Sequence, residues 1–234
     1  MPVAIVTGAS RGFGRALAAD LLREGWNVVI DARNAADLDE VAAQLRVGAV
    51  GEVRAEPGHV ADAAHRRRLV AEAEALGRLD LLVNNASVLG PSPQPTLDRY
   101  PLDVFETVYR VNVIAPLGLI QEALTLVEAS GGVIVNVTSD AAVEGYEGWG
   151  GYGSSKAALE QLSRVLAAEV ATVPVYWFDP GDMRTRMHQE AFPGEDISDR
   201  PEPETVVPAL RRLLHDRPAS GRYRASDLLH GARP

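Results

Sequence analysis

The sequence predicts an α/β fold in which a doubly wound parallel sheet carries helices on both of its faces. Short segments rich in β-branched residues alternate with longer segments rich in Ala, Leu, Glu and Arg, which indicates alternating strands and helices. Two of the predicted strands, 79–86 and 131–139, are apolar on both faces, as expected of strands covered by helices on both sides. Right-handed crossovers between parallel strands would then complete the sheet.

The same patterns give the order of the elements. We expect strands at 3–8, 27–32, 51–56, 79–86, 131–139 and 173–181. Helices are expected between them, at 14–25, 35–46, 61–77, 102–114, 116–129 and 151–171, and a last helix at 203–216. Gly25 ends the first of these helices, a position where glycine is favoured.

The chain is expected to form one domain, residues 1–234, because no repeat and no long linker divides it. Two Pro-rich segments, 89–103 and 192–204, interrupt the alternation of strands and helices. Proline and its neighbours disfavour regular structure, so we expect both segments to be loops within that domain.

Composition argues against several classes of function. The formal net charge of −9 argues against a large nucleic-acid surface, which needs a basic face, and the arginine run 66–68 is interpreted as a solvated helix face. The chain has no cysteine, so disulfides, thiolate nucleophiles and Cys-ligated metals are excluded. The five histidines show no HxxxH or HxH spacing, so no metal site is expected.

The chain shows neither a leader peptide nor a membrane span. Its first residues carry no basic segment followed by an apolar core. No apolar stretch approaches the roughly 20 residues that a transmembrane helix needs. We therefore expect a soluble, cytoplasmic protein that acts on a small molecule, without a nucleic-acid or membrane partner.

A glycine-rich turn follows the first predicted strand. Gly8, Gly12 and Gly14 form the pattern GxxxGxG in the segment 7–18. Glycine lets a backbone approach a pyrophosphate closely, and the amides and dipole of the following helix favour that anion. The alternative is a purely structural turn, but a Rossmann-type strand, glycine turn, helix and second strand together indicate dinucleotide binding. A Walker loop is excluded because no Gly-Lys-Ser/Thr follows.

The residues expected to select between NAD(H) and NADP(H) favour different cofactors. An acidic residue closing the second strand binds the ribose hydroxyls of NAD, whereas arginine there accommodates the extra phosphate of NADP. The chain offers both, Asp31 and Arg33, and strand alternation places them on one face. Arg11 in the glycine turn favours a phosphate, because guanidinium binds phosphate in a forked geometry. NADP(H) is therefore favoured, the alternative being that Arg33 only pairs with Asp31 or Asp37.

Six motifs in register carry a family resemblance. They are TGASRGFG at 7–14, NNAS at 84–87, Asn112 within VYRVNVIAP, VIVNVTSD at 133–140, YGSSK at 152–156 and DPGDMRT at 179–185. In order and spacing they resemble the short-chain dehydrogenase/reductase family, from Val3 to about Thr185. A Tyr-x-x-x-Lys pair alone occurs by chance in many proteins, whereas six motifs in register are highly specific.

The resemblance implies roles for four catalytic residues. Tyr152 is similar to the general acid of carbonyl reduction, or the base of alcohol oxidation. Lys156 matches a lysine that lowers the pKa of this phenol and binds the nicotinamide ribose. Ser139 matches the serine that hydrogen-bonds the substrate oxygen, and Asn112 the asparagine that helps to hold a proton-relay water.

The resemblance also implies a cofactor site. It combines the glycine turn, the end of the second strand, later loops and the Tyr/Lys pair: Gly8, Ser10, Arg11, Gly12, Phe13, Gly14, Arg33, Val60, Asn85, Ala86, Tyr152, Lys156, Pro180, Gly181, Met183 and Thr185. Two positions depart from the family pattern. Ser87 stands where NNAG has glycine, and His59 stands where a small acidic or amide residue is usual, so its contact with adenine is left open against a plain loop position.

The chemistry of the Tyr/Lys pair also follows from the residues themselves. Free tyrosine titrates near pH ~10, too high to exchange protons efficiently at neutral pH. A cation one helical turn away favours the phenolate and lowers that pKa. Residues four apart share a helix face, so Tyr152 and Lys156 can reach one ligand, and the small residues between them, Gly153 to Ser155, leave room for it.

Two segments are expected to form the substrate loops, about 140–150 and 183–203. The first offers Val143 and Trp149, and the second offers Met187. These side chains predict an apolar pocket, the alternative being that they cover the edge of the sheet. Segment 192–204 is a candidate for a mobile lid.

The favoured function is an NAD(P)(H)-dependent oxidoreductase that transfers a hydride between nicotinamide and a carbonyl or secondary alcohol. One alternative is a dehydratase or epimerase that uses the same Tyr/Lys pair, although the chain lacks the larger C-terminal domain typical of sugar-nucleotide epimerases. The other is a regulatory protein that binds NADP(H) without turnover. The resemblance further implies a homodimer or homotetramer, paired through helices at about 104–127 and 154–170.

Overall fold

A computed structural model describes residues 1–230, in which seven parallel strands form one sheet. The strands are β1 (Val3–Val6), β2 (Asn27–Ala32), β3 (Val53–Pro57), β4 (Leu81–Asn84), β5 (Val133–Val137), β6 (Val175–Asp179) and β7 (Gly221–Arg224). Their order across the sheet is β3-β2-β1-β4-β5-β6-β7. Strand order therefore reverses between β1 and β4, which is where ligands bind in doubly wound sheets. The predicted Rossmann-type fold is confirmed; the last four residues of the predicted domain lie outside the described part.

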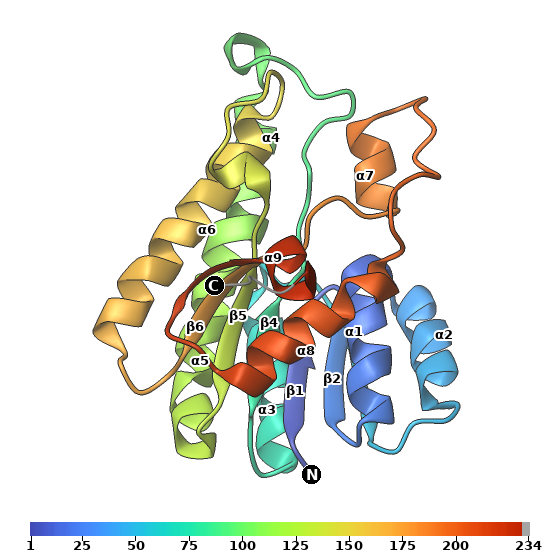
Figure 1. The fold of residues 1–234 in the computed structure, drawn as a ribbon, viewed down its shortest axis with the longest axis vertical. Coiled ribbons are helices and arrows are strands. Elements are labelled where there is room, and N and C mark those ends of the chain that lie inside the picture. Colours follow the sequence, from blue (N-terminus) through green and yellow to red (C-terminus); the bar gives the residue numbers. More distant parts are fainter. Residues whose placement is uncertain (231–234) are drawn as a thin grey trace.

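Helices cover both faces of this sheet (Figure 1). They are α1 (Gly12–Arg23), α2 (Ala35–Arg46), α3 (Ala63–Ala75), α4 (Leu102–Tyr109), α5 (Ala115–Ser130), α6 (Gly150–Glu169), α7 (Arg186–Ala191), α8 (Val207–Asp216) and α9 (Ala225–His230). One core packs α1, α2 and α8 against the sheet, and the other packs α3, α5 and α6 against its opposite face. Every residue of β1 and β4 is buried, which explains why β1 is apolar throughout and β4 is apolar except for Asn84.

Three elements at the C-terminal end differ from the prediction. Strand β7 and helix α9 follow α8, and α7 forms within the loop expected at 183–203. Strand β7 has the sequence GRYR and is only partly buried at the edge of the sheet, so it lacks the apolar pattern that marks a buried strand. Helices α7 and α9 span six residues each, too short for helical periodicity to be read from sequence.

The two helices expected at 102–114 and 116–129 form one continuous helical segment, Leu102–Ser130. By length and composition it is long and apolar enough to cross a membrane, which corrects the expectation that no stretch approaches that length. Its inward residues, including Leu119, Ile120 and Val127, lie in a core that also contains residues of α3 and the sheet. Packing against the sheet therefore accounts for the apolar residues on its inward face.

Candidate active site

A cavity of about 980 Å³ opens at the carboxyl ends of the strands. The glycine turn after β1 and the end of β2 line one part of it, and Ser139, Tyr152 and Lys156 line another. Helix α7 lies beyond this edge of the sheet, apart from the two helical layers (Figure 1). The cavity therefore lies where the reversal of strand order predicts a ligand.

The glycine turn provides a cradle for an anion. Gly8 and Gly12 have positive φ angles of 68° and 55°, and a Cβ at Gly8 would lie 2.8 Å from the Cα of Ala86. No side chain caps the first turn of α1, and its residues Gly12 and Phe13 line the cavity. Its amides are therefore free to bind a pyrophosphate, so the residues present fit a dinucleotide.

Gly14 serves the packing of this turn rather than the lining of the cavity. A Cβ at Gly14 would press on the side-chain amide of Asn85 and lie 2.9 Å from the carbonyl oxygen of Gly8. Asn85 in turn donates to the carbonyl oxygen of Thr7 at 2.8 Å. Gly14 therefore lets α1 approach the loop after β4, which is the role of close helix packing that the third glycine of such motifs plays.

Each carboxylate oxygen of Asp31 has a hydrogen-bond partner inside the protein. Its Oδ1 accepts from the amide of Gly8 at 2.6 Å, and its Oδ2 lies 2.9 Å from Nε2 of His65. Both side chains are buried, whereas Arg33, which follows the end of β2, is exposed. Asp31 and Arg33 both line the cavity. Asp31 therefore holds the glycine turn, whereas no side-chain partner among residues 1–230 fixes Arg33.

Tyr152 and Lys156 lie on one face of α6, as their spacing predicts. The ammonium of Lys156 is 5.5 Å from the centroid of the Tyr152 ring. Its Nζ also donates to the carbonyl oxygen of Val137 at 2.8 Å. The lysine is thereby anchored to the end of β5, and both side chains are buried.

Burial sets the protonation of both groups. It raises the pKa of Tyr152 well above the usual value, and the charges of Asp179 and Asp140 raise it further, whereas the hydroxyls of Ser87 and Ser139 oppose the rise. Burial also lowers the pKa of Lys156 to about 8. The phenol's pKa therefore lies above its usual value, and not below it as the Tyr/Lys spacing predicted. Desolvation of the phenolate is the largest cause, and Lys156 is not among the groups that shift this pKa.

Asn112 lies in a π-helical turn, Arg110–Ile114, between α4 and α5. Its Oδ1 accepts from the amide of Val88 at 2.9 Å and from Ser87 Oγ at 3.1 Å. Its Nδ2 donates to the Val88 carbonyl oxygen and to Ser155 Oγ, at 2.9 and 3.0 Å. The side chain therefore ties the loop after β4 to α6 and does not line the cavity. Such π turns occur frequently at functional sites.

Ser139 and Ser87 bring two hydroxyls to the phenol. Ser139 Oγ donates to Oδ1 of Asp140 at 2.8 Å. Ser87 lines the cavity and contacts both Asn112 and the phenol of Tyr152. Ser87 entered the sequence prediction only as a departure from the family pattern, yet its position directly after the NNA motif placed it at the cofactor loop.

The two predicted substrate loops meet at Trp149. Its ring lies 5.8 Å from that of Tyr152 and 5.9 Å from that of Phe192, in centroid distances. Trp149 and Met187 line the cavity, whereas Val143 is exposed and lies outside it. Val143 follows a 3-10 turn, Asp140–Ala142, and Tyr146 from the same loop donates to Asp140 Oδ2 at 3.0 Å.

The remaining predicted cofactor residues line the same cavity, namely Ser10, Arg11, Val60, Asn85, Ala86, Pro180, Gly181, Met183 and Thr185. His59 lines it as well and is half-buried. Its Nδ1 accepts from the amide of Ala61 at 3.0 Å, and burial and Arg33 lower its pKa. His59 therefore does not have the environment of a plain exposed loop residue. Within residues 1–230, no group of three or more His, Cys, Asp or Glu could hold a metal ion.

Known proteins resemble this chain over most of its length. Residues 2–196 match the family model described as short chain dehydrogenase. The chain is 39% identical over 198 residues to a rhamnolipids biosynthesis 3-oxoacyl-[acyl-carrier-protein] reductase of Pseudomonas aeruginosa, covering 79% of this chain and 74% of that protein.

Solved structures share the fold as well. A short-chain dehydrogenase from Pseudomonas syringae superposes with a TM-score of 0.90 at 33% identity, covering 96% of this chain and 94% of that one. Another, from Shigella flexneri in complex with NADP, gives 0.89 at 29% identity, covering 96% and 97%. The chain therefore belongs to the short-chain dehydrogenase/reductase family and is an NAD(P)-dependent oxidoreductase.

Proposed function

We propose that the protein is an NADP(H)-dependent reductase that converts a small-molecule carbonyl into a secondary alcohol, with Tyr152 as the proton donor. One observation supports this proposal most. The glycine cradle and the cluster of Ser139, Tyr152 and Lys156 line the same cavity. A cofactor bound on the cradle would extend toward that cluster. A non-catalytic binding protein has no need for a buried phenol and ammonium at this place.

The residues divide the reaction as follows. A nicotinamide held in this cavity would supply the hydride for the carbonyl carbon. Tyr152 gives its phenolic proton to the carbonyl oxygen, and Ser139 donates a hydrogen bond to that oxygen. Because burial raises the pKa of Tyr152, the phenol carries its proton at neutral pH and enters the reaction as an acid. Lys156, held by the Val137 carbonyl oxygen, orients the ribose and later helps to restore the proton.

Three residues support the preference for NADP(H) over NAD(H). Asp31, which would bind the ribose hydroxyls of NAD, already holds the Gly8 amide and His65. Arg33 is exposed in the cavity, and Arg11 lines it from the glycine turn. The two guanidiniums favour a phosphate on the adenosine ribose, although the exposed carboxylate of Asp37 lines the same part of the cavity.

The substrate is proposed to enter between the loops 140–150 and 183–203. Trp149 and Met187 line the cavity there, and Phe192 packs against Trp149. This apolar wall beside Tyr152 suits a carbonyl with an apolar substituent. The name of the Pseudomonas aeruginosa relative adds a 3-oxoacyl thioester to the candidates.

The test is NADPH oxidation measured across a panel of ketones, aldehydes and a 3-oxoacyl thioester, with NADH in parallel. We expect turnover of at least one carbonyl, with higher kcat/KM for NADPH. Replacing Tyr152 by Phe should abolish turnover and leave NADPH binding intact, because the ring remains and only the proton donor is lost. Full activity of Tyr152→Phe would refute the assignment, and tight NADPH binding without any turnover would favour the regulatory alternative.

We also propose a cytoplasmic homodimer or homotetramer. Leu102, Ile114 and Val165 are large apolar side chains that α4, the π turn and α6 leave exposed, on the helices that the family resemblance assigns to subunit pairing. Light scattering on the purified chain tests this, and a monomer at micromolar concentration would contradict it.

A further inference from the structure

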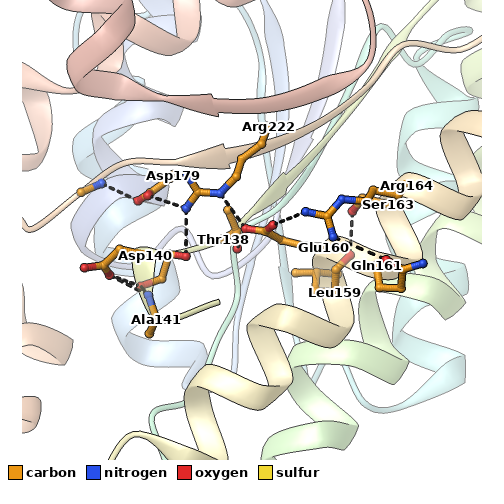
Figure 2. Close-up of polar contacts among 12 residues, drawn as sticks. Thr138, Asp140, Ala141, Leu159, Glu160, Gln161, Ser163, Arg164, Asp179 and Arg222 are labelled. Atoms are coloured by element: carbon orange, nitrogen blue, oxygen red, sulfur yellow. Dashed lines mark hydrogen bonds and ion pairs between the residues drawn. The ribbon is translucent and has the colours of Figure 1, made fainter. Parts of the chain in front are cut away.

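A buried ionic cluster lies behind the predicted catalytic residues, and none of the assigned roles uses it. Figure 2 shows Arg222 of β7 between Asp179 of β6 and Glu160 of α6, with Arg164 on the far side of Glu160. Glu160 and Asp179 are buried, and the side chain of Arg222 is 17% exposed. Removing a charge from water costs several kcal/mol, so buried charges are usually paired and hydrogen-bonded.

The guanidinium of Arg222 contacts three separate segments. Its Nε donates to Oε1 of Glu160 at 2.9 Å, and its Nη2 donates to Oδ2 of Asp179 at 2.8 Å. The same Nη2 lies 3.2 Å from the backbone carbonyl oxygen of Ser139, to which it donates. One planar group thus connects β7, the end of β6, the turn after β5 and helix α6.

Each partner of Arg222 is next to a residue of the site. Glu160 is one helical turn after Lys156 in α6, and its Oε1 also accepts from Thr138 Oγ1 at 2.9 Å. Asp179 precedes Pro180 and Gly181, and its Oδ1 accepts from the Gly181 amide at 3.0 Å. Ser139 itself carries the hydroxyl beside the phenol. The cluster therefore touches three segments that the proposed reaction uses: the turn after β5, the turn after β6 and helix α6.

We propose that Arg222 is a positioning residue of the reaction, which holds Ser139, the Asp179–Gly181 turn and the Tyr152/Lys156 helix in one fixed arrangement. This inference rests on the proposed function, because it assumes that these segments carry out the chemistry. Lysine cannot replace the guanidinium, since a single ammonium cannot present the forked donors that reach two carboxylates and a carbonyl oxygen at once.

Arg222 also has an electrostatic effect on the phenol. The carboxylate of Asp179 acts on Tyr152 and raises its pKa, and Arg222 pairs with that carboxylate. Removing the guanidinium leaves the negative charge uncompensated beside the phenol, whereas removing the carboxylate takes the charge away. The two changes act on the phenol in opposite directions.

The experiment compares Arg222→Met, Arg222→Lys and Asp179→Asn with Arg164→Met as the matched control. Arg164 also pairs with Glu160, at 3.1 Å, but it is exposed on the outer side of the cluster. The measurements are kcat and KM for the best carbonyl of the panel, the pH profile of oxidation of its alcohol, NADPH affinity by fluorescence, and amide hydrogen exchange at 139–142 and 179–185.

For Arg222→Met we expect a loss in kcat of about 10²-fold, the size that a misplacement of about 1 Å produces, with a smaller change in KM. Arg222→Lys should recover little of this loss. The pH midpoint of alcohol oxidation should rise in Arg222→Met and fall in Asp179→Asn, a pair of opposite shifts that loss of stability alone does not produce. Hydrogen exchange should increase at both segments in Arg222→Met and in Arg222→Lys. Arg164→Met should keep the exchange of the wild type and stay within about twofold of it in kcat.

Equal kcat, pH midpoints and exchange in Arg222→Met and Arg164→Met would overturn the inference. If Arg222→Met does not fold, Arg222→Lys and Asp179→Asn decide by the same kinetic and exchange measurements. The proposed function fails separately, through full activity of Tyr152→Phe, and in that case hydrogen exchange still decides whether Arg222 holds the two segments.

Discussion

At the scale of single residues, the site depends on hydroxyls and charges that surround one phenol. Tyr152 is flanked by Ser87 and Ser139, which lower its pKa, and by Asp140 and Asp179, which raise it together with burial. The balance favours the protonated phenol. Each of these neighbours is therefore a separate point at which the proton transfer can be altered.

Replacing Ser87 by Gly tests the hydroxyl that departs from the family pattern. Its contact with the phenol lowers the pKa of Tyr152, so its loss should move the pH midpoint of alcohol oxidation upward. We expect a fall of about fivefold in the oxidation rate at neutral pH, the equivalent of one ordinary hydrogen bond. The pH profile of kcat/KM is the measurement.

Ser154→Ala is the control, because the Ser154 hydroxyl bonds only within its own helix, to the Gly151 carbonyl oxygen at 3.2 Å. Its pH profile should match the wild type. If Ser87→Gly also matches the wild type, Ser87 does not act on the phenol.

At the scale of elements, close packing of α1 against the loop after β4 holds the glycine cradle. Gly14 makes this approach possible, because a Cβ there would press on Asn85 and on the Gly8 carbonyl oxygen. Asp31 of β2 adds a second hold on the turn through the Gly8 amide. The cradle is therefore built by three elements and not by the glycine turn alone.

Gly14→Ala should destabilise the protein even though alanine favours helices. The helix preference gains about 1 kcal/mol, and we expect crowding against Asn85 to cost about 1–3 kcal/mol, together with weaker NADPH binding. Urea unfolding and fluorescence titration measure the two effects. Gly145→Ala is the control, since a Cβ there meets nothing within 4 Å; equal stability and affinity of the two variants would contradict the packing role.

At the scale of the whole molecule, the fold buries the amino group of Lys156 in its interior. Burial lowers the pKa of Lys156 from 10.5 to about 8. Between these values the unfolded chain keeps a proton that the folded protein has released, so the free energy of unfolding rises with pH in that window.

Replacing Lys156 by Met removes this contribution. From pH 8 to pH 10 we expect the unfolding free energy of the wild type to rise by about 2–3 kcal/mol relative to Lys156→Met. Urea unfolding of both proteins at four pH values is the measurement. A difference that stays constant with pH would mean that Lys156 has an ordinary pKa in the folded protein.

The sequence by itself determined the sheet and most of the predicted site. Fully apolar strands, the glycine turn and the Tyr152/Lys156 spacing are local patterns, because burial on both faces, a tight turn and one helical turn each leave a mark within a few residues. The cofactor residues predicted in the later loops, which also line the cavity, came from the family resemblance and not from such patterns. Strand β7 was not predicted, because an edge strand with polar residues shows no apolar pattern in the sequence.

Only the tertiary structure decided which charges meet. The members of two buried pairs, Asp31 with His65 and Arg222 with Glu160, are far apart in sequence. No local pattern shows that they form hydrogen bonds with each other. Glu160 did share a helix face with Lys156, but its partner came from a strand that the sequence concealed. The same holds for the direction in which the pKa of Tyr152 shifts, because desolvation by the whole fold is its largest cause and no local pattern shows that burial.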